Sequence, residues 1–220
     1  MQNEILNFRP EKEGTAKLFH NPILDLLTRT SPWVIIPLDL FISGVLVIIG
    51  IFHFHLSIRL FPWLFISGML TWTLTEYLMH RFAFHFPAKS PLGQKAVYTI
   101  HLVHHHYPHD EDRLFQPPLV NILLAAIFTF IFFLILGPKA FFFSPGFVVG
   151  YILYSSLHFS IHKFKPPFPF MQKIWRHHNL HHYRCPDRAF GVSSPFWDLV
   201  FGTMPHQEFS KTSHKNMEET

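Results

Sequence analysis

The chain has little of three things that would point to common protein classes. It has one cysteine, Cys185, among 220 residues, which excludes an intramolecular disulfide and any zinc or iron–sulfur site built from several cysteines. Charged residues make up only 15%, against about 25% in soluble domains. The net charge is +4, yet no basic helix, RNA-binding motif or run of Lys and Arg alternating with aromatics is present. We therefore expect a membrane protein with no nucleic-acid partner.

Long hydrophobic runs are what the chain has instead. Hydrophobic residues make up 49% of it, and 27 residues are Phe. Four apolar blocks are each long enough to cross a hydrocarbon core of roughly 30 Å; they cover residues 33–52, 60–78, 119–136 and 141–157. These blocks predict an all-α integral membrane fold with four transmembrane helices. We expect Asp39, inside the first block, to lie near the interface or to have a partner.

The distribution of Lys and Arg predicts the topology. Four lie in the first 31 residues, four in 81–118 and eight in 158–220, whereas the two intervening turns hold one each, Arg59 and Lys139. Because positive charge accumulates on the cytoplasmic side, both termini and the polar segments are expected there. We predict a cytoplasmic lead at 1–32 with a short interfacial helix near 22–28, a four-span domain with a cytosolic helical cap at 33–205, and a flexible tail at 206–220. A bacterial inner membrane or the endoplasmic reticulum would suit this topology.

Histidine is the residue type that carries chemistry here. His101, His104 and His105 stand at i, i+3 and i+4, so a helix would place them on one face. Neutral imidazole is a common transition-metal ligand. Three further groups have similar spacing: His80 with His85, His158 with His162, and His178 with His181 and His182. All four groups fall on the predicted cytoplasmic side, where they could form one centre.

Ten imidazoles are too many for one ion and suit two. His80 and His85 are five apart, about 140° round a helix, so they either serve different metals or the helix ends between them. Glu76 could accept a hydrogen bond from His80 and fix its tautomer, or could extend to the interface as a solvated charge. Asp198 is a further candidate for supporting the ligands. We expect His106, His109 and His177 to lie beside the metal ligands or at the surface.

Ligands placed just outside the hydrocarbon core suggest redox chemistry on a lipid. A pair of iron ions at this boundary would suit dioxygen activation and attack on an unactivated C–H bond, with substrate from the bilayer and electrons from the cytosol. The alternative from another class is a non-enzymatic zinc-handling membrane protein, although transporters usually place their ligands along a path within the membrane. Zinc could also occupy an iron site after purification.

Several longer motifs resemble those of the fatty acid 2-hydroxylases, within the fatty acid hydroxylase and sterol desaturase superfamily. The resemblance runs from about residue 70 to 204 and rests on four segments: Glu76-Tyr77-x2-His80-Arg81-Phe82-x-Phe84-His85; His101-x2-His104-His105-x-Tyr107-Pro108-x-Asp110-x2-Arg113-Leu114-x2-Pro117-Pro118; Tyr154-x3-His158-x3-His162; and His178-x2-His181-His182-Tyr183 followed by Phe190-Gly191-Val192-Ser193-Ser194-Pro195-Phe196-Trp197-Asp198-x2-Phe201-Gly202-Thr203.

This resemblance implies that all ten histidines are metal ligands and that a four-helix membrane bundle carries a cytosolic cap. It also implies hydroxylation at the second carbon of a fatty acyl chain, free or in ceramide, with dioxygen and two electrons. Eukaryotic relatives often carry a fused haem domain, for which 220 residues leave no room, so we expect a separate electron donor of cytochrome b or ferredoxin type. Sister branches of the superfamily, namely lipid or sterol desaturases and carotenoid hydroxylases, are the nearest alternatives.

Aromatic residues beside the histidine motifs are candidates for an acyl groove. These are Phe84, Tyr107, Phe190 and Trp197. Tyr154, one turn before His158, could either join that groove or support the metal ligands.

Overall fold

The computed structural model describes residues 10–11 and 14–206, and every regular element in that part of the chain is helical. Most of the predicted 206–220 tail and the start of the predicted lead lie outside the described residues. The chain divides into two compact units. We call them the helical unit, residues 17–75 and 110–159, and the histidine unit, residues 76–109 and 160 onward with the N-terminal piece up to residue 16.

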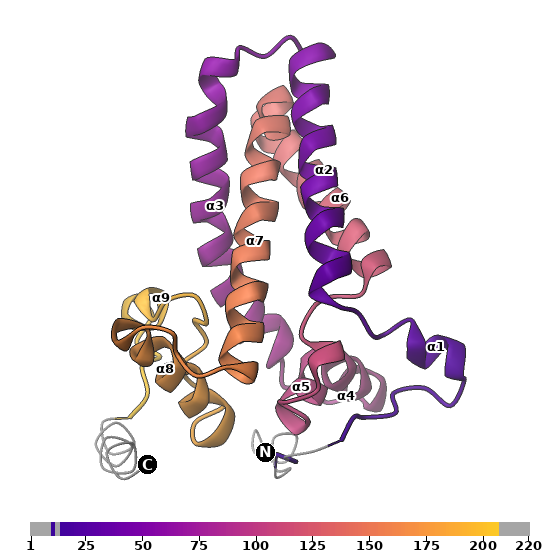
Figure 1. Ribbon diagram of the computed structural model, residues 1–220, viewed down its shortest axis with the longest axis vertical. Helices are drawn as coiled ribbons and strands as arrows, with labels where there is room; N and C mark the ends of the chain where they lie inside the picture. Colours follow the sequence, from indigo (N-terminus) through magenta and orange to yellow (C-terminus); the bar gives the residue numbers. More distant parts are fainter. Residues whose placement is uncertain (1–9, 12–13, 207–220) are drawn as a thin grey trace. The chain divides into compact units, whose positions relative to one another are not determined.

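Five helices and three short 3-10 turns lie wholly or largely in the helical unit (Figure 1). They are α1 Pro22–Leu26, α2 Pro32–Phe52, η1 Ile58–Leu60, α3 Phe61–Leu78, η4 Glu111–Arg113, α6 Pro118–Leu136, η5 Gly137–Lys139 and α7 Ala140–Lys163. The four long helices coincide with the four apolar blocks, so the prediction that these blocks are helical is confirmed. The short helix expected near residues 22–28 is also present, as α1.

Sequence signals explain where these helices begin. The side chain of Ser31 accepts a hydrogen bond from the backbone N–H of Trp33, and Pro32 occupies the first turn of α2. A capping hydroxyl followed by Pro is a common helix start, because the missing proline N–H would have no partner in the first turn anyway. Pro118 likewise occupies the first turn of α6, where Pro117 is the N-cap and no side chain caps the helix.

Helices α3 and α7 pack with their backbones in close contact. A Cβ atom at Gly146 would lie 1.9 Å from the carbonyl oxygen of Phe65, and one at Gly68 would lie 2.1 Å from that of Phe143. The ring of Trp72 packs edge-on against Phe147, with ring centroids 5.0 Å apart. Small residues at these positions therefore permit the contact, as in many membrane helix pairs.

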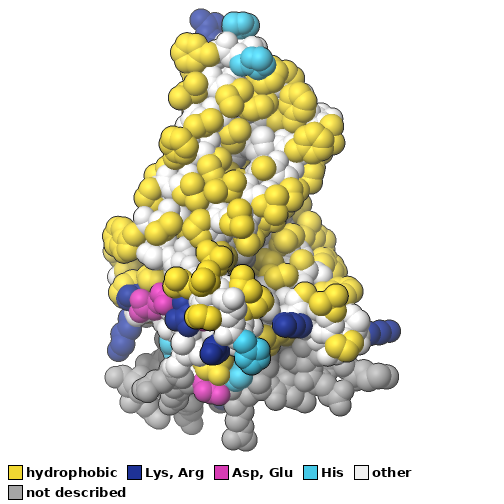
Figure 2. Space-filling view, turned by 90° about the vertical axis from the view of Figure 1, so that its right-hand side faces the viewer, with side chains coloured by type: hydrophobic (Ala, Val, Ile, Leu, Met, Phe, Trp, Pro, Cys, Tyr) yellow, Lys and Arg dark blue, Asp and Glu magenta, His cyan; other side chains and the backbone are white. Residues whose placement is uncertain are grey.

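The outer surface of the helical unit is strongly apolar. Large hydrophobic side chains such as Trp33, Phe41, Leu119 and Ile135 are exposed, and hydrophobic side chains cover much of the face seen in Figure 2. Two helical stretches are long and apolar enough to cross a membrane: Pro32–Phe52, and Glu111–Lys163, which contains α6 and α7. Asp39 is buried in α2 and accepts a 2.5 Å hydrogen bond from the Asn121 amide of α6, so it has the expected partner.

The histidine unit consists of shorter elements. It contains the π-helical turns η2 Met79–Phe84 and η3 Tyr98–Leu102, with α4 Pro91–Val97, α5 Val103–His106, η6 Pro169–Met171, α8 Gln172–Tyr183 and α9 Phe196–Val200. An irregular segment, residues 184–195, joins α8 to α9. All but one of the predicted histidine ligands lie in this unit.

Candidate metal centre

One set of histidines, here the first group, brings together distant parts of the histidine unit. Its members are His80, His85, His101, His105 and His181, and one ligand atom from each lies within 4.8 Å of all the others. Four of the five side chains are buried, and His85 is partly buried. The group draws on η2, η3, α5 and α8 and on the residue that ends η2.

A π-helical turn explains why His80 and His85 belong to the same group. The backbone N–H of His85 donates to the carbonyl of His80 at 3.1 Å, the i→i+5 bond of a π-helix. This wider turn places residues five apart on one side, whereas an α-helix would separate them by about 140°. The spacing left open whether these two side chains serve different metals. In this structure both belong to the same group.

A second group gathers the remaining imidazoles. His104, His162, His178 and His182 are buried, and their ligand atoms lie within 4.8 Å of one another. His158 lies on α7 one turn before His162, so the two share a helix face. The local spacing does not assign each histidine to a group, because adjacent members of one sequence motif belong to different groups. His104 and His182 belong to the second group, whereas His105 and His181 belong to the first.

The imidazole nitrogens converge at distances that suit a metal ion. The Nε2 atoms of His80 and His101 are 3.0 Å apart, and those of His101 and His105 are also 3.0 Å apart. In the second group, the Nε2 atoms of His162 and His178 are 2.8 Å apart. Two ligands bound at right angles about 2.1 Å from an ion would lie about 3 Å apart. The residues present therefore fit a metal site in each group.

Backbone carbonyl groups set the tautomers of two first-group histidines. The Nδ1 atom of His80 lies 2.6 Å from the Phe190 oxygen, and that of His181 lies 2.6 Å from the Arg188 oxygen. A carbonyl can only accept, so each Nδ1 carries the proton. Each Nε2 then has a free lone pair, which is the form that binds a metal.

Burial keeps these imidazoles neutral. It lowers the pKa of His80 to about 4 and holds the pKa of His105, His181 and His182 well below the usual value. Burial penalises the charged form, and neighbouring imidazoles add to the effect at His105, His181 and His182. The groups thus offer unprotonated ligands at neutral pH.

The residues predicted to support the ligands divide into different roles. Glu76 was expected either to accept a hydrogen bond from His80 or to extend to the interface as a solvated charge, but it is buried and has other partners. Its Oε1 instead accepts from the backbone N–H of Val192 at 2.7 Å and of Ser193 at 2.8 Å. Tyr154 stacks on His158 with ring centroids 5.8 Å apart, a position from which it could orient that candidate ligand.

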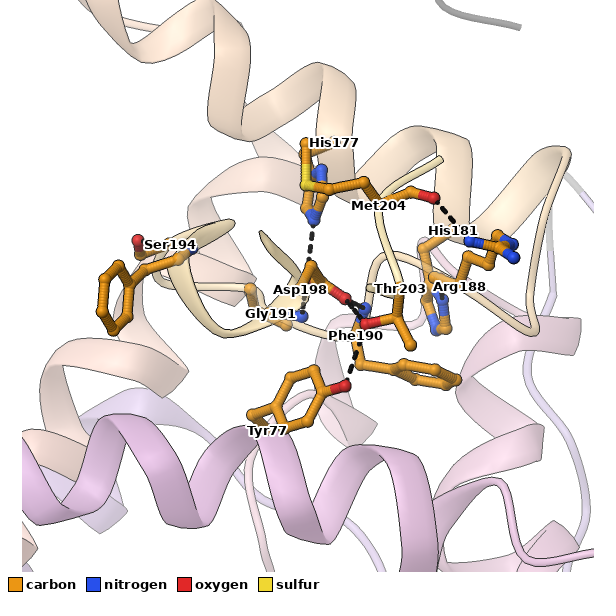
Figure 3. Close-up of polar contacts among 12 residues, drawn as sticks. Tyr77, His177, His181, Arg188, Phe190, Gly191, Ser194, Asp198, Thr203 and Met204 are labelled. Carbon is orange, nitrogen blue, oxygen red and sulfur yellow. Dashed lines mark hydrogen bonds and ion pairs between the residues drawn. The ribbon is translucent and has the colours of Figure 1, made fainter. Parts of the chain in front are cut away.

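Asp198 is fully buried and connects several elements (Figure 3). Its carboxylate accepts from Nε2 of His177 at 2.9 Å, the N–H of Phe190 at 2.9 Å, the N–H of Gly191 at 2.8 Å and the hydroxyl of Thr203 at 2.7 Å. Burial alone would raise the pKa of Asp198, but these hydrogen bonds, led by that from His177, outweigh it and lower the pKa. His177 therefore has a carboxylate partner.

The other two histidines that we expected beside the ligands also have identifiable contacts. His109 donates from Nδ1 to the backbone carbonyl of His162 at 3.1 Å. The Nδ1 atom of His106 lies 2.9 Å from the Tyr98 hydroxyl, and its Nε2 atom lies 3.5 Å from the carboxylate of Glu11.

Two of the four predicted groove residues border the first group. The Phe84 ring stacks on His101 with centroids 5.0 Å apart, and the Phe190 ring contacts His80, His85 and His181 at 5.7, 5.6 and 5.5 Å. Tyr107 packs against His106 instead, and Trp197 packs against Phe196 and Phe201. The carbonyl groups of Arg188 and Phe190 could not be predicted from the sequence as partners of His181 and His80, because every residue has a carbonyl.

Comparison with known proteins identifies relatives of this chain. The model of the fatty acid hydroxylase family matches residues 65–203. The ceramide very long chain fatty acid hydroxylase SCS7 of Saccharomyces cerevisiae is 37% identical over 209 residues, which cover 92% of this chain and 53% of SCS7. The dihydroceramide fatty acyl 2-hydroxylase FAH1 of Arabidopsis thaliana is 38% identical over 144 residues, 64% of this chain and 60% of FAH1.

A solved structure shows the same fold. The hydroxylase domain visible in full-length scs7p matches with a TM-score of 0.82 at 34% identity, covering 93% of this chain and 78% of that one. The chain thus spans between about half and three fifths of the length of the SCS7 and FAH1 proteins.

Proposed function

This chain belongs to the fatty acid hydroxylase family, and on that premise we propose that it hydroxylates the second carbon of a fatty acyl chain, either free or in a ceramide. The observation that carries this proposal is the pair of buried histidine groups, each with several imidazole nitrogens close enough to bind one ion. The relatives SCS7 and FAH1 are named for hydroxylation of the acyl chains of ceramide and dihydroceramide. Their names support a lipid substrate for this chain.

We propose that each group holds one iron ion. The first ion would be held by His80, His85, His101, His105 and His181, and the second by His104, His158, His162, His178 and His182. When bound and reduced, the pair would supply the activation of dioxygen and insertion of one oxygen atom, with two electrons from a separate carrier of cytochrome b or ferredoxin type. Ligands that are all neutral leave the ions their full charge, unlike the carboxylate-rich sites of soluble di-iron bundles.

The chain itself contributes orientation and exclusion of water. Burial keeps the imidazoles unprotonated, and the carbonyl groups of Arg188 and Phe190 direct two lone pairs inward. The rings of Phe84 and Phe190 border the first group and offer an apolar surface for an acyl chain. We propose Tyr107 and Trp197 as more distant parts of the same acyl path.

The proposed topology has four membrane spans, formed by α2, α3, α6 and α7, within a hydroxylase domain at 33–205. The apolar exterior of the helical unit and the Lys and Arg distribution support it. Both termini and the metal centre would then lie on the cytoplasmic side. A lipid substrate could enter laterally from the bilayer, and the electron carrier could dock from the aqueous side.

The test is product analysis with the purified chain. The chain is supplied with ferrous iron, a reductase system and either a fatty acid or a ceramide, and the lipids are examined by mass spectrometry. We expect a 2-hydroxy acyl product that His105→Ala abolishes and that His20→Ala, which changes an exposed histidine, leaves unchanged. A desaturated or differently oxidised lipid would instead assign the chain to a sister branch. Tight zinc with metal flux across vesicles and no turnover would favour the zinc-handling alternative.

A further inference from the structure

The segment after α8 presents two carbonyl groups to the same metal group. Arg188 and Phe190 are separated by one residue, and their carbonyl oxygens accept from His181 and His80, which lie 101 positions apart in the sequence. Ala189 between them has φ of +59°, a left-handed conformation that L residues rarely adopt. The orientation of two first-group imidazoles therefore depends on the conformation of residues 188–190.

Asp198 fixes that conformation by accepting hydrogen bonds from two successive amides. The backbone N–H groups of Phe190 and Gly191 donate to its two carboxylate oxygens, one to each (Figure 3). The position of Gly191 leaves no room for a side chain, because a Cβ atom there would lie 2.2 Å from the Ser194 oxygen and 3.0 Å from Asp198. The Gly191 N–H and the Phe190 carbonyl belong to the same peptide unit, so the carboxylate holds the unit whose carbonyl orients His80.

A chain of hydroxyl groups holds Asp198 in turn. The Thr203 hydroxyl donates its one proton to Asp198 at 2.7 Å, so it accepts from the Tyr77 hydroxyl at 2.8 Å. The Tyr77 hydroxyl in turn accepts from Arg81 at 2.9 Å. The Thr203 carbonyl also accepts from the N–H of Ala189 at 2.9 Å. Tyr77, Asp198 and Thr203 are all at least nine-tenths buried. In a low-dielectric interior, such a connected network has a defined geometry and is costly to leave incomplete.

We propose that Asp198 is a positioning residue for one of the two proposed metal sites, an inference that rests on the proposed function. Through the N–H of Gly191, which shares a peptide unit with the Phe190 carbonyl, it holds the group that aims His80. Through Thr203, whose carbonyl accepts from the Ala189 N–H in the peptide unit of the Arg188 carbonyl, it also holds the group that aims His181. Both of those imidazoles belong to the first group. Asp198 therefore sets the metal affinity of the first site while the second site remains intact.

An acceptor-only carboxylate is required here, which provides a sharp test. Asp198→Asn replaces one oxygen by an NH2 group that would face N–H or O–H donors, whereas Asp187→Asn makes the same change at an exposed position in the same segment. Each purified variant is titrated with Zn²⁺ against a chelator and with Co²⁺ by visible absorption. We expect two ions in the wild type and in Asp187→Asn. In Asp198→Asn, one ion should bind about 10- to 100-fold more weakly, the range for loss of a group that orients a ligand.

The inference is overturned if Asp198→Asn holds both ions with wild-type affinity, or if it loses both to the same extent while folded. Should that variant not fold, Thr203→Val provides the same test, since it removes one donor to Asp198. It should weaken the first ion by a smaller factor, and Thr203→Ser, which keeps the hydroxyl, should restore it. Equal binding by the Val and Ser variants would contradict the proposal.

The metal readout also separates this inference from the proposed function. If the wild type binds two ions and Asp198→Asn loses one, but no 2-hydroxy lipid is formed, the positioning role stands and the hydroxylase assignment fails. If Asp198→Asn hydroxylates lipid and keeps both ions, the positioning role fails and the hydroxylase assignment stands.

Discussion

The two units of this protein fix their geometry in different ways. In the helical unit, positions follow from packing: apolar helices contact one another, and Gly68 and Gly146 allow backbones to touch. In the histidine unit, positions follow from directional hydrogen bonds that end on Asp198, Glu76 and backbone carbonyls. Packing tolerates exchange of one apolar residue for another of similar volume. A hydrogen-bonded network tolerates few substitutions, because each lost partner leaves a buried polar group without a hydrogen bond.

Low pH should destabilise the histidine unit of the metal-free protein more than the helical unit, and this is the largest effect that we expect. The folded-state pKa of His80 is about 4, below the unfolded value of about 6.5. Between these values the unfolded chain binds more protons, so the stability present above pH 6.5 is lost as the pH falls toward 4. His80 alone accounts for about 3 kcal/mol, since each pKa unit corresponds to about 1.4 kcal/mol.

The measurement is the thermal unfolding midpoint of the chelator-treated protein in detergent between pH 7 and pH 4. Burial also lowers the pKa of His105, His181 and His182, so the fall should be steep. A midpoint that stays constant to pH 4.5 would contradict the buried, neutral state of the group.

The close contact between α3 and α7 gives the next largest effect. Gly146→Ala would place a methyl group against the Phe65 carbonyl, a backbone atom that cannot move aside easily. We expect a loss of about 3 kcal/mol, the upper part of the overpacking range. The matched control is Gly44→Ala in α2, where nothing lies within 4 Å of the new Cβ atom. That change should stabilise the protein by up to about 1 kcal/mol through helix propensity. Equal midpoints for the two variants would show that the helices do not touch at Gly146.

Glu76 tests whether the network of the histidine unit needs both side-chain oxygens at this position. Glu76→Gln keeps one acceptor for the amides of Val192 and Ser193 but places an NH2 group at the oxygen that bonds to the Ser193 hydroxyl. We expect a loss of about 1 to 3 kcal/mol, the usual cost of disrupting a buried hydrogen bond. Ser193→Ala removes one donor alone and should cost less. If Glu76→Gln unfolds at the wild-type midpoint, the segment 190–203 is held without this carboxylate.

The different physics of the units explains what the sequence could predict. Hydropathy alone located the four long helices, because a helix needs only an apolar stretch of sufficient length and suitable ends, such as Ser31 and Pro118. Spacing identified the histidines that gather in two groups. It could not assign them to a group, since that assignment depends on a π-helical turn at His80 and on how the chain folds around His104 and His105, which join different groups.

The supporting contacts were harder to predict for a physical reason. Glu76 was expected either to accept a hydrogen bond from His80, one turn away, or to extend to the interface, but its partners lie 116 and 117 positions further along the chain. The groups that orient His80 and His181 are backbone carbonyls, which no residue type marks. Gly191 is one position in this segment where the residue type does reflect the backbone arrangement, because a side chain there would collide with Ser194.

The smallest effect concerns Ala189, and it separates backbone conformation from side-chain packing. An alanine in the left-handed conformation is strained by about 1 kcal/mol, and a glycine is not. Glycine also gives the unfolded chain more freedom, which costs a similar 0.4 to 1 kcal/mol. Ala189→Gly should therefore change the free energy of unfolding by less than about 0.5 kcal/mol and leave the affinity of the first metal group unchanged. Ala189→Val, by contrast, places a branched side chain at a fully buried position with φ of +59° and should destabilise clearly. A large loss for Ala189→Gly would mean that the methyl group of Ala189 packs to hold the two carbonyls, and that the histidine unit also depends on packing at this point.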